Sequence, residues 1–388
     1  MKGYRTLGEL VERVDERNIN DEHLPLAGLS IDKFFINSVA NTIGTDLSKY
    51  KLIKKDEFAV SLMQVSRDSK IPVARYDGEK AIMSPAYSIF KVRNRREIIP
   101  EYLDMWFKRP EFDREATFIA VGGVRGSMPY SDFERMKVIV PSYEEQLHIV
   151  NNYRVIKDRI DLKRRINDNL TEQCLVDYNH MLNGYTPENE ELPDGWSKGC
   201  IGSYCDVKSG FAFKSDWWTT EGVKVIKIAN IVNNTIDLDS CDCVIAEHAE
   251  KAKNFYVQSG DMLIAMTGAT TGKIGIVPLC DEPIVVNQRV GKFFLGGKPI
   301  EKAPFLYATL LNSRVLCHLQ PDGTAGSAQD NLSADNIKDI AIVLPEQSVI
   351  NSFNLQHVPH IKTIISNCAE IRMLNRFTET ILQTLSRR

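Results

Sequence analysis

Residues 138–146 read VIVPSYEEQ, and residues 342–347 read IVLPEQ. In each copy, a run of β-branched and aliphatic residues typical of a strand ends at a proline that opens a helical pattern. The two prolines, Pro141 and Pro345, are 345 − 141 = 204 residues apart, a little over half of the 388-residue chain. A repeat with so long a period indicates two equivalent modules, each followed by its own long helix.

The repeat extends beyond this phrase. Asp56 and Asp261 precede matching strand-like runs at a shift of 261 − 56 = 205 residues, and Ser84 and Asn287 stand at matching places at a shift of 287 − 84 = 203. Because the shift changes so little over a module, we expect the two modules to share a fold. Residue identity between them is low, which predicts different surfaces. The second copy of the phrase is shortened, so the start of the second helix is left open.

Both modules mix strand and helix signals, which predicts an α/β (α+β) fold class with two such domains in tandem. The strand-like runs are 57–62, 87–92, 260–265 and 285–290, and helical stretches follow at 100–107 and 304–311. The expected boundaries are 1–141 and 196–345 for the domains, 142–183 and 346–388 for the long helices, and 184–195 for a linker rich in Gly, Pro and acidic residues.

The two helical patterns carry apolar residues at three- and four-residue spacing, which suits a helix packed on another helix. Ser142 and Glu145 have the spacing of a capping box. Polar residues such as Lys163 interrupt the stripe, where they lower stability and fix register. The expected seam consists of Tyr153, Ile156, Ile160, Asn167, Leu170, Cys174, Ile361, Ile364, Cys368, Ile371, Asn375 and Leu382. The alternative is that each helix packs only on its own domain.

Composition is that of an ordinary globular protein, with 43% hydrophobic and 26% charged residues and a net charge of −3. This balance disfavours a globally basic nucleic-acid binder. The N-terminus lacks an apolar signal core and no apolar run reaches about 18 residues, so we expect a cytoplasmic location. The eight cysteines form no CxxC pair, and Cys241, Cys243 and His248 fit no common zinc motif.

Catalytic motifs are missing from the sequence. Residues 268–273 read GATTGK, with three residues between the glycines where a phosphate-binding Walker A loop needs four, and Ile274 stands where that loop needs Ser or Thr. We expect a tight turn between two strands there, or a loop that approaches phosphate. No dinucleotide fingerprint and no adenine-methyltransferase tetrapeptide (NPPY or DPPY) is present. No residue is therefore assigned a catalytic role.

Polar and basic loops supply candidates for DNA contact, because Arg pairs with guanine, and Asn or Gln with adenine, through two hydrogen bonds. The candidates are Arg67, Lys70, Arg125, Ser127, Thr270, Lys273, Asn287, Gln288, Arg289, Ser327 and Gln329. For each of them the alternative is a solvated loop residue.

Several of these phrases, in this order, resemble the specificity (S) subunit of type I restriction-modification systems. They are YRTLGEL at 4–10, SVAN at 38–41, LPDGW at 192–196, GDMLIAMTGAT at 260–270, NQRV at 287–290 and the two proline-to-Gln phrases. Together they span most of the chain, and the shortened second phrase is the one departure.

The resemblance implies that each domain is a target-recognition domain that reads one half of a split DNA site. The helices would then form an antiparallel coiled coil that sets the spacing and docks two modification (methyltransferase) subunits. S-adenosylmethionine, ATP and Mg would belong to modification and restriction/translocase subunits, with no cofactor in this chain. A helix of about 35 residues spans about 50 Å, on the order of 15 base pairs. The expected site is bipartite and asymmetric, because the polar loops of the modules differ.

Three other functions stay open. A coiled-coil scaffold would recruit partners without any DNA sequence preference. A single-chain nuclease would cleave DNA with a metal ion and no partner. A DNA-reading subunit of another defence system would lack an adenine methyltransferase gene beside its own.

Overall fold

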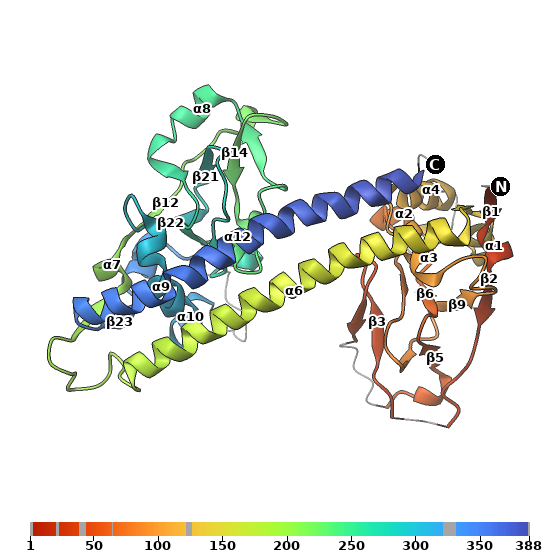
Figure 1. Cartoon of the computed structure of the whole chain (residues 1–388), viewed down its shortest axis with the longest axis horizontal. Coiled ribbons are helices and arrows are strands. Elements are labelled where there is room, and N and C mark those ends of the chain that lie inside the picture. Colours follow the sequence, from red (N-terminus) through yellow and green to blue (C-terminus); the bar gives the residue numbers. More distant parts are fainter. Residues whose placement is uncertain are drawn as a thin grey trace. The chain divides into compact units, whose positions relative to one another are not determined.

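The computed structural model describes residues 3–20, 23–38, 44–63, 65–121, 126–320 and 331–386. The chain divides into a first unit, residues 1–158 with 376–388, and a second unit, residues 159–375. Each unit combines strands with helices, which confirms the predicted fold class (Figure 1). Among the described helices, none combines the length and the apolar character that crossing a bilayer requires.

In the first unit the largest described sheet has the strand order β2-β9-β6-β7, beside three two-stranded ladders. The strands are β1 Gly3–Thr6, β2 Val11–Val14, β3 Ala27–Leu29, β4 Phe35–Asn37, β5 Lys51–Lys54, β6 Phe58–Val60, β7 Val73–Arg75, β8 Lys80–Met83, β9 Ser88–Val92 and β10 Lys137–Val140. The short helices are α1 Leu7–Leu10, α2 Val65–Asp68, α3 Pro100–Phe107, α4 Pro110–Ala120 and α5 Tyr130–Arg135.

The second unit holds two larger sheets, ordered β12-β22-β19-β20-β16-β15 and β13-β17-β14-β21-β18, and the β11-β23 pair. The strands are β11 Ser197–Cys200, β12 Asp206–Ser209, β13 Trp218–Thr219, β14 Val223–Ile226, β15 Ile231–Val232, β16 Thr235–Ile236, β17 Asp242–Val244, β18 Tyr256–Val257, β19 Met262–Ala265, β20 Ile274–Ile276, β21 Ile284–Val286, β22 Val290–Phe294 and β23 Ala341–Leu344. The short helices are α7 Ile201–Tyr204, α8 Ala246–Glu250, α9 Pro299–Leu311, α10 Ser313–Leu319 and α11 Ala334–Lys338.

The repeated strand before each proline closes its own unit. β10 pairs antiparallel with β1, and β23 pairs antiparallel with β11. The same hydrogen bond extends each ladder, since the Leu7 N–H donates to the Met136 carbonyl at 2.9 Å and the Ile201 N–H donates to the Ile340 carbonyl at 3.0 Å. The repeat in sequence is therefore a repeat in topology, in which the last strand of each unit pairs with the first.

Two helices of 40 residues each follow, α6 Tyr143–Leu182 and α12 Gln347–Ser386. Each begins two residues after its proline, so the two helices match end to end at the shift of 204. The capping box of α6 is confirmed, because the Glu145 N–H donates to Ser142 Oγ at 3.3 Å while Glu145 Oε2 accepts from the Ser142 N–H at 3.3 Å.

The Glu-Gln ends of the two phrases are not equivalent, although their letters agree. Gln146 is fully buried: its Oε1 accepts from the Ile99 N–H at 2.9 Å and its Nε2 donates to the Glu97 carbonyl at 2.8 Å. Gln347 is exposed and donates to Asn351 on its own helix. Gln146 stands five residues after its proline and Gln347 two, so only the prolines align the two helices.

The predicted pairing of Asp56 with Asp261 is wrong by one residue. Glu57 Oε2 accepts from the Lys54 N–H at 2.8 Å, and Asp261 Oδ2 accepts from the Gln258 N–H at 2.9 Å, both at the shift of 204. Both acids are buried, and burial raises the pKa of each carboxyl. The equivalent of Asp261 is thus Glu57, because the buried carboxylate holds the same turn before β6 and β19.

Most expected elements are present, with two differences in the second unit. The strand expected over 285–290 is interrupted, because residues 287–289 form a turn between β21 and β22. The helix expected over 304–311 begins earlier, at Pro299, and contains Pro304 in its interior. In the first unit Pro100 stands at the first position of α3, whereas Pro304 lies inside α9, which begins at Pro299.

Candidate nucleic-acid interface

A turn of the same construction precedes β9 in the first unit and β22 in the second. Ser84 Oγ accepts from the Ala86 N–H at 3.3 Å, and Asn287 Oδ1 accepts from the Arg289 N–H at 3.2 Å. The backbone closes each turn in the same way, through Tyr87 N–H to Ser84 O at 3.2 Å and Val290 N–H to Asn287 O at 2.9 Å. Residues 84–87 and 287–290, here called the first turn and the second turn, are therefore equivalent, as the sequence match predicted.

The second turn lies beside the hairpin loop 266–273, which joins β19 to β20. The Met266 N–H donates to the Arg289 carbonyl at 3.0 Å, and the Ala265 N–H donates to the Lys273 carbonyl at 2.8 Å. Residues 268–270 of this loop form a short 3-10 turn, so the glycine-rich phrase lies between two strands, as expected. Thr270, Lys273 and the second turn thus meet at one end of the six-stranded sheet.

The polar side chains at this sheet end are available to a ligand. Lys273, Gln288 and Arg289 are exposed, whereas Asn287 is half-buried and caps the turn. Within the described part of the chain, no ion pair involves Lys273 or Arg289. The Thr270 hydroxyl is buried and lacks a hydrogen-bond partner among the described residues. Two cations and an amide that have no side-chain partner among the described residues suit phosphate and base contacts.

The candidates of the first unit also gather, but their charges are already paired. The Arg67 guanidinium donates to Asp68 at 2.6 Å, and the Lys70 ammonium donates to Asp32 at 2.7 Å. The hydrogen bond from the Arg67 guanidinium lowers the pKa of the Asp68 carboxyl. The segment that carries Ser127 lies beside them, because a Cβ on Gly126 would meet Ser66 and the Arg67 backbone.

One further backbone bond confirms that these two sheet ends correspond. The Met128 N–H donates to the Leu62 carbonyl at 2.9 Å, and the Leu332 N–H donates to the Met266 carbonyl at 2.9 Å, both at the shift of 204. Arg125, Ser327 and Gln329 lie outside the described residues.

Sequence reasoning missed the support behind the second turn. Phe211 forms an isolated bridge with Asn287, and the Gln288 N–H donates to the Phe211 carbonyl at 2.9 Å. Gly210 precedes it, and a Cβ there would overlap the carbonyl groups of Val286 and Asn287. Phe211 packs in turn against Phe213, with ring centroids 5.1 Å apart. The sequence signal was a glycine followed by aromatic residues, which is too common to point to a turn that lies 287 − 211 = 76 residues further along the chain.

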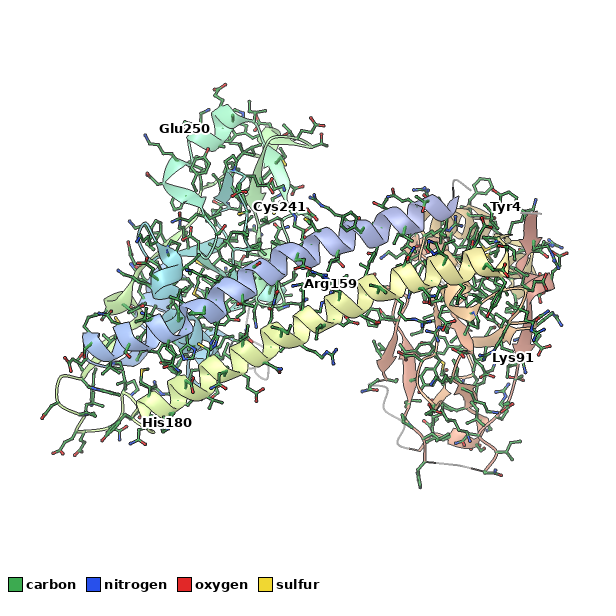
Figure 2. All side chains as sticks on the ribbon, viewed as in Figure 1. Tyr4, Lys91, Arg159, His180, Cys241 and Glu250 are labelled. Atoms are coloured by element: carbon green, nitrogen blue, oxygen red, sulfur yellow. The ribbon has the colours of Figure 1, made fainter. Side chains whose placement is uncertain are left out.

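The long helices pack antiparallel within the second unit. As the residue number increases along α6, the residue number of the contacting partner on α12 decreases. Arg159 pairs with Glu370 at 2.5 Å, Lys163 with Asn367 at 2.8 Å, and Asp177 with Gln356 at 3.2 Å. Figure 2 places Arg159 on α6 where α12 runs alongside.

The residues expected in the seam fall into two sets according to their burial. The buried members are Ile160, Cys174, Ile361 and Ile364, and the half-buried members are Tyr153, Ile156, Asn167, Leu170, Cys368, Ile371, Asn375 and Leu382. Tyr153 and Leu382 pack on the core of the first unit, whereas Leu170 and Cys368 pack on that of the second. Cys174 belongs to the core of the second unit, and its burial raises the pKa of the thiol to about 12.

A polar layer occupies the middle of the helix pair. Asn367 is 6% exposed, accepts from the Lys163 ammonium and donates to Asn167 Oδ1 at 2.8 Å. Lys163 also pairs with Glu370 Oε2 at 2.6 Å, and this contact lowers the pKa of the Glu370 carboxyl. Lys163 and Asn367 are 204 residues apart, so the hydrogen bond between them joins equivalent positions of the repeat. The shift applied to Lys163 would have identified Asn367 from sequence.

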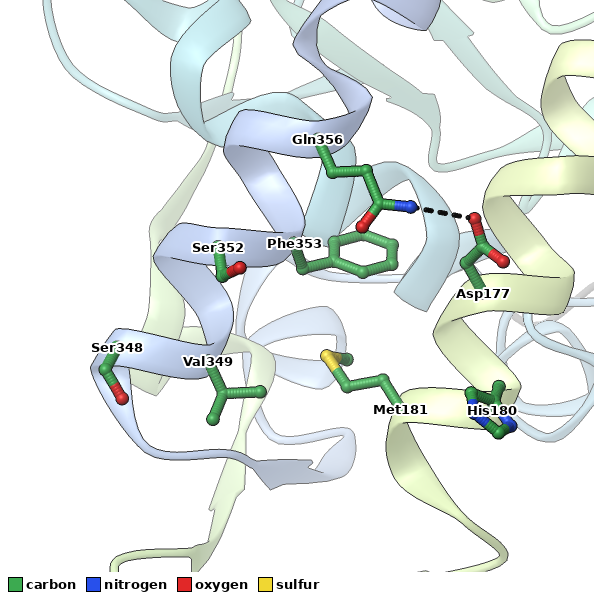
Figure 3. A pocket seen from close by; sticks show the side chains of 8 residues that line it. All are labelled: Asp177, His180, Met181, Ser348, Val349, Ser352, Phe353 and Gln356. Carbon is green, nitrogen blue, oxygen red and sulfur yellow. Dashed lines mark hydrogen bonds between the residues drawn. The ribbon is translucent and has the colours of Figure 1, made fainter.

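Near the end of the pair, a groove of about 410 Å³ lies between α6 and α12 in the second unit (Figure 3). Met181, Val349 and Phe353 give it an apolar floor. Beside it, His357 is fully buried, with Nε2 3.3 Å from Asp177 Oδ2 and Nδ1 2.8 Å from His360 Nδ1.

The described residues contain no group of three His, Cys, Asp or Glu side chains that could hold a metal ion. His248, which the sequence places near Cys241 and Cys243, stacks instead on Trp217 with ring centroids 4.1 Å apart.

Residues 193–363 match the family described as Type I restriction modification DNA specificity domain. The chain is 26% identical over 253 residues to the MjaVIII type I restriction enzyme specificity subunit of Methanocaldococcus jannaschii, covering 61% of this chain and 57% of that protein. It is 30% identical over 106 residues to the EcoAI specificity subunit of Escherichia coli, covering 26% and 18%. The alignments thus span little more than half of the first relative and less of the second.

The fold is similar to the crystal structure of a type I restriction-modification system S subunit from M. genitalium. The TM-score is 0.55 at 16% sequence identity, and the match covers 99% of this chain and 96% of that one. This likeness shows the fold. The sequence matches show that residues 193–363 resemble the type I restriction modification DNA specificity domain and that the chain is similar to type I restriction enzyme specificity subunits.

Proposed function

We propose that this chain is the DNA sequence-specificity subunit of a type I restriction-modification complex. Each unit reads one half of a bipartite, asymmetric site. The observation that carries the proposal is the pair of equivalent sheet ends, which share their backbone hydrogen bonds while their exposed side chains differ. Two readers on the same frame with different surfaces are what an asymmetric two-part site requires.

The proposed domain boundaries remain 1–141 and 196–345 for the two target-recognition domains, 142–183 and 346–388 for the helices, and 184–195 for the linker. The closing ladders β1-β10 and β11-β23 support the ends of the domains, and the bounds of α6 and α12 support those of the helices.

The helix pair is the proposed dock for two modification subunits. Apolar side chains remain exposed on it within the second unit: Leu162 is 51% exposed, Val176 55% and Met373 55%. Exposed aliphatic residues on a helix that already buries its seam suit a partner helix. Methyl transfer, ATP-driven translocation and cleavage would then belong to the partner subunits, and this chain would act in the cytoplasm without chemistry of its own.

Single-molecule methylation mapping of the host genome tests the proposal. We expect one methylated adenine motif in two parts, separated by roughly one to one and a half DNA turns, which disappears when the gene is deleted. A motif that persists after deletion would exclude the function. Sequence-specific DNA binding by the chain in a host that shows no adenine methylation dependent on the gene would favour the second candidate, the reader of another defence system.

The complex should be purified with its modification subunits for binding assays on the mapped site. Double replacement of Leu162 and Val176 by Glu is expected to abolish co-purification while the chain stays folded. Replacing the exposed cations Lys362 and Arg165 with Glu is the matched control, because it changes charge on the same helices without removing apolar surface.

A further inference from the structure

The first turn carries exposed residues of a different chemistry from the second. Pro85 and Ala86 are exposed at the positions where the second turn presents Gln288 and Arg289. Neither Pro85 nor Ala86 has a side-chain donor or acceptor, so neither can read a base edge by hydrogen bonding. The frame of the turn is kept, because Ser84 makes the same cap as Asn287.

Another apolar side chain emerges at the same sheet end. Met63 is 56% exposed and follows β6, and Val60 of β6 pairs with Ser88 of β9. In an antiparallel pair, the residues after Val60 and before Ser88 leave the sheet at the same end, so Met63 and the first turn share it. At the shift of 204, Met63 stands where the second unit has Thr267.

The cations nearby do not offset this apolar character. Arg67 and Lys70 are held by Asp68 and Asp32. In the second unit, by contrast, Lys273 and Arg289 make no ion pair among the described residues. The first sheet end therefore combines exposed methyl and methylene groups with neutralised charge.

We infer that the first unit reads its half-site in part by apolar contact with the C5 methyl groups of thymine, whereas the second unit reads by hydrogen bonds. Thymine is the base whose major-groove edge presents a methyl group, and small apolar side chains are its usual partners. Ala86 and Pro85 make this contact, with Met63 beside them. The inference rests on the proposed function, since it requires that the sheet ends face DNA.

A deoxyuridine scan of the mapped site tests this with the full chain in complex with its modification subunits. Each thymine of the first half-site is replaced in turn by deoxyuridine, which removes only the methyl group. We expect Kd to rise about threefold to fivefold at one or more positions, the loss of one buried methyl contact. The same scan of the second half-site is the matched control, and Kd there should change less than about twofold, since uracil keeps the O4 acceptor.

Combining the deoxyuridine substitution with protein variants shows whether Ala86 makes the methyl contact. Ala86→Gly should raise Kd on the natural site by a similar factor and cancel the effect of the sensitive deoxyuridine, while Arg289→Gly should leave that effect unchanged. Pro85→Ala serves as a second variant, and thermal unfolding confirms that each variant is folded. Failure of the complex to prefer the mapped site over random DNA would overturn the proposed function and this inference together. Three results, each with specific binding retained, would overturn this inference alone. Deoxyuridine could leave Kd unchanged at every position, the first half-site could contain no thymine, or the deoxyuridine effect could persist in Ala86→Gly.

Discussion

The two sheet ends differ in what they offer to DNA although they are built alike. The second presents Gln288, Arg289 and Lys273 without ion pairs among the described residues, and the first presents Pro85 and Ala86 beside charges held by acids. Equivalent backbone hydrogen bonds, at shifts of 203 and 204 residues, preserve the frame in both. The difference teaches that a duplicated reader keeps its turns, which backbone geometry demands, and varies only the side chains that no backbone bond constrains.

The largest effect is expected where the second turn is supported. Gly210→Ala would place a Cβ against the carbonyl groups of Val286 and Asn287, and backbone atoms cannot move aside as a flexible side chain can. We expect the second unit to lose about 2–3 kcal/mol of stability, measured by urea unfolding, together with recognition of the second half-site. The matched control is Gly297→Ala, since a Cβ there meets nothing within 4 Å. Equal stability of the two variants would contradict the role of Gly210.

The next effect compares the free and the paired arginine. Arg289→Ala should weaken binding to the specific site by about 1–3 kcal/mol and relax base preference in the second half-site, as for loss of a two-bond contact to guanine. Arg67→Ala should change Kd less than about threefold, because Asp68 already holds that guanidinium. Binding assays on the mapped site measure both. A larger loss for Arg67 than for Arg289 would reverse the comparison.

A smaller effect is expected in the polar layer, where equivalent positions of the two helices meet. Asn367→Ala should cost about 1–2 kcal/mol in urea unfolding, because Asn167 Oδ1 loses its donor and Lys163 keeps only its contact with Glu370. Replacing Lys163, Asn167 and Asn367 together with Leu should restore most of that stability, since none of the three polar side chains is then left without its partner. Lys362→Ala on the exposed face is the control. A triple variant less stable than Asn367→Ala would show that the layer adds net stability.

The smallest expected effect is a pH dependence confined to one helix end. His357 stands 204 residues after Tyr153, so an imidazole, which titrates near neutral pH, occupies in α12 the place of a phenol in α6. Burial lowers the pKa of His357 below its ordinary 6.5, and the neighbouring His360 lowers it further, against the opposing effect of Asp177. The unfolded state therefore binds the proton first, so stability is complete above pH 6.5 and declines as pH falls below it.

Urea unfolding at pH 7.5 and 5.5 measures this decline. His357→Gln should remove part of the difference between the two values, whereas His180→Gln, at an exposed position of α6, should leave it unchanged. An unchanged difference in His357→Gln would assign the pH dependence to other groups.

Much of the fold was readable from sequence because local patterns carry it. The strand–proline–helix phrase predicted β10 with α6 and β23 with α12, and a capping box needs only Ser142 and Glu145 at the right spacing. The turns at Ser84 and Asn287 were matched for the same reason. The errors arose where residues of the two modules were matched by type alone, without their burial and hydrogen bonds. Asp56 was matched with Asp261, whose structural equivalent is Glu57, and Gln146 is buried while Gln347 is exposed.

The candidate site was predicted in composition and not in arrangement. The sequence singled out Lys273, Gln288 and Arg289 as polar loop residues, and the sheet brings them to one end. It singled out Arg67 and Lys70 on equal terms, without showing that Asp68 and Asp32 hold them. It gave Pro85 and Ala86 no role, because apolar turn residues match no binding motif. Their position became informative only when the first turn was compared with the polar second turn.

By itself, then, the sequence determined that this protein is a duplicated two-unit chain with two matched long helices, because the spacing of prolines and apolar residues is a local and additive signal. Only the tertiary structure decided which residues face each other, from Lys163 against Asn367 to the second turn on Phe211. It also decided which charges remain free to meet a ligand. Those outcomes depend on contacts between distant segments, and hydrogen bonds and ion pairs form or fail over distances that only the folded chain sets.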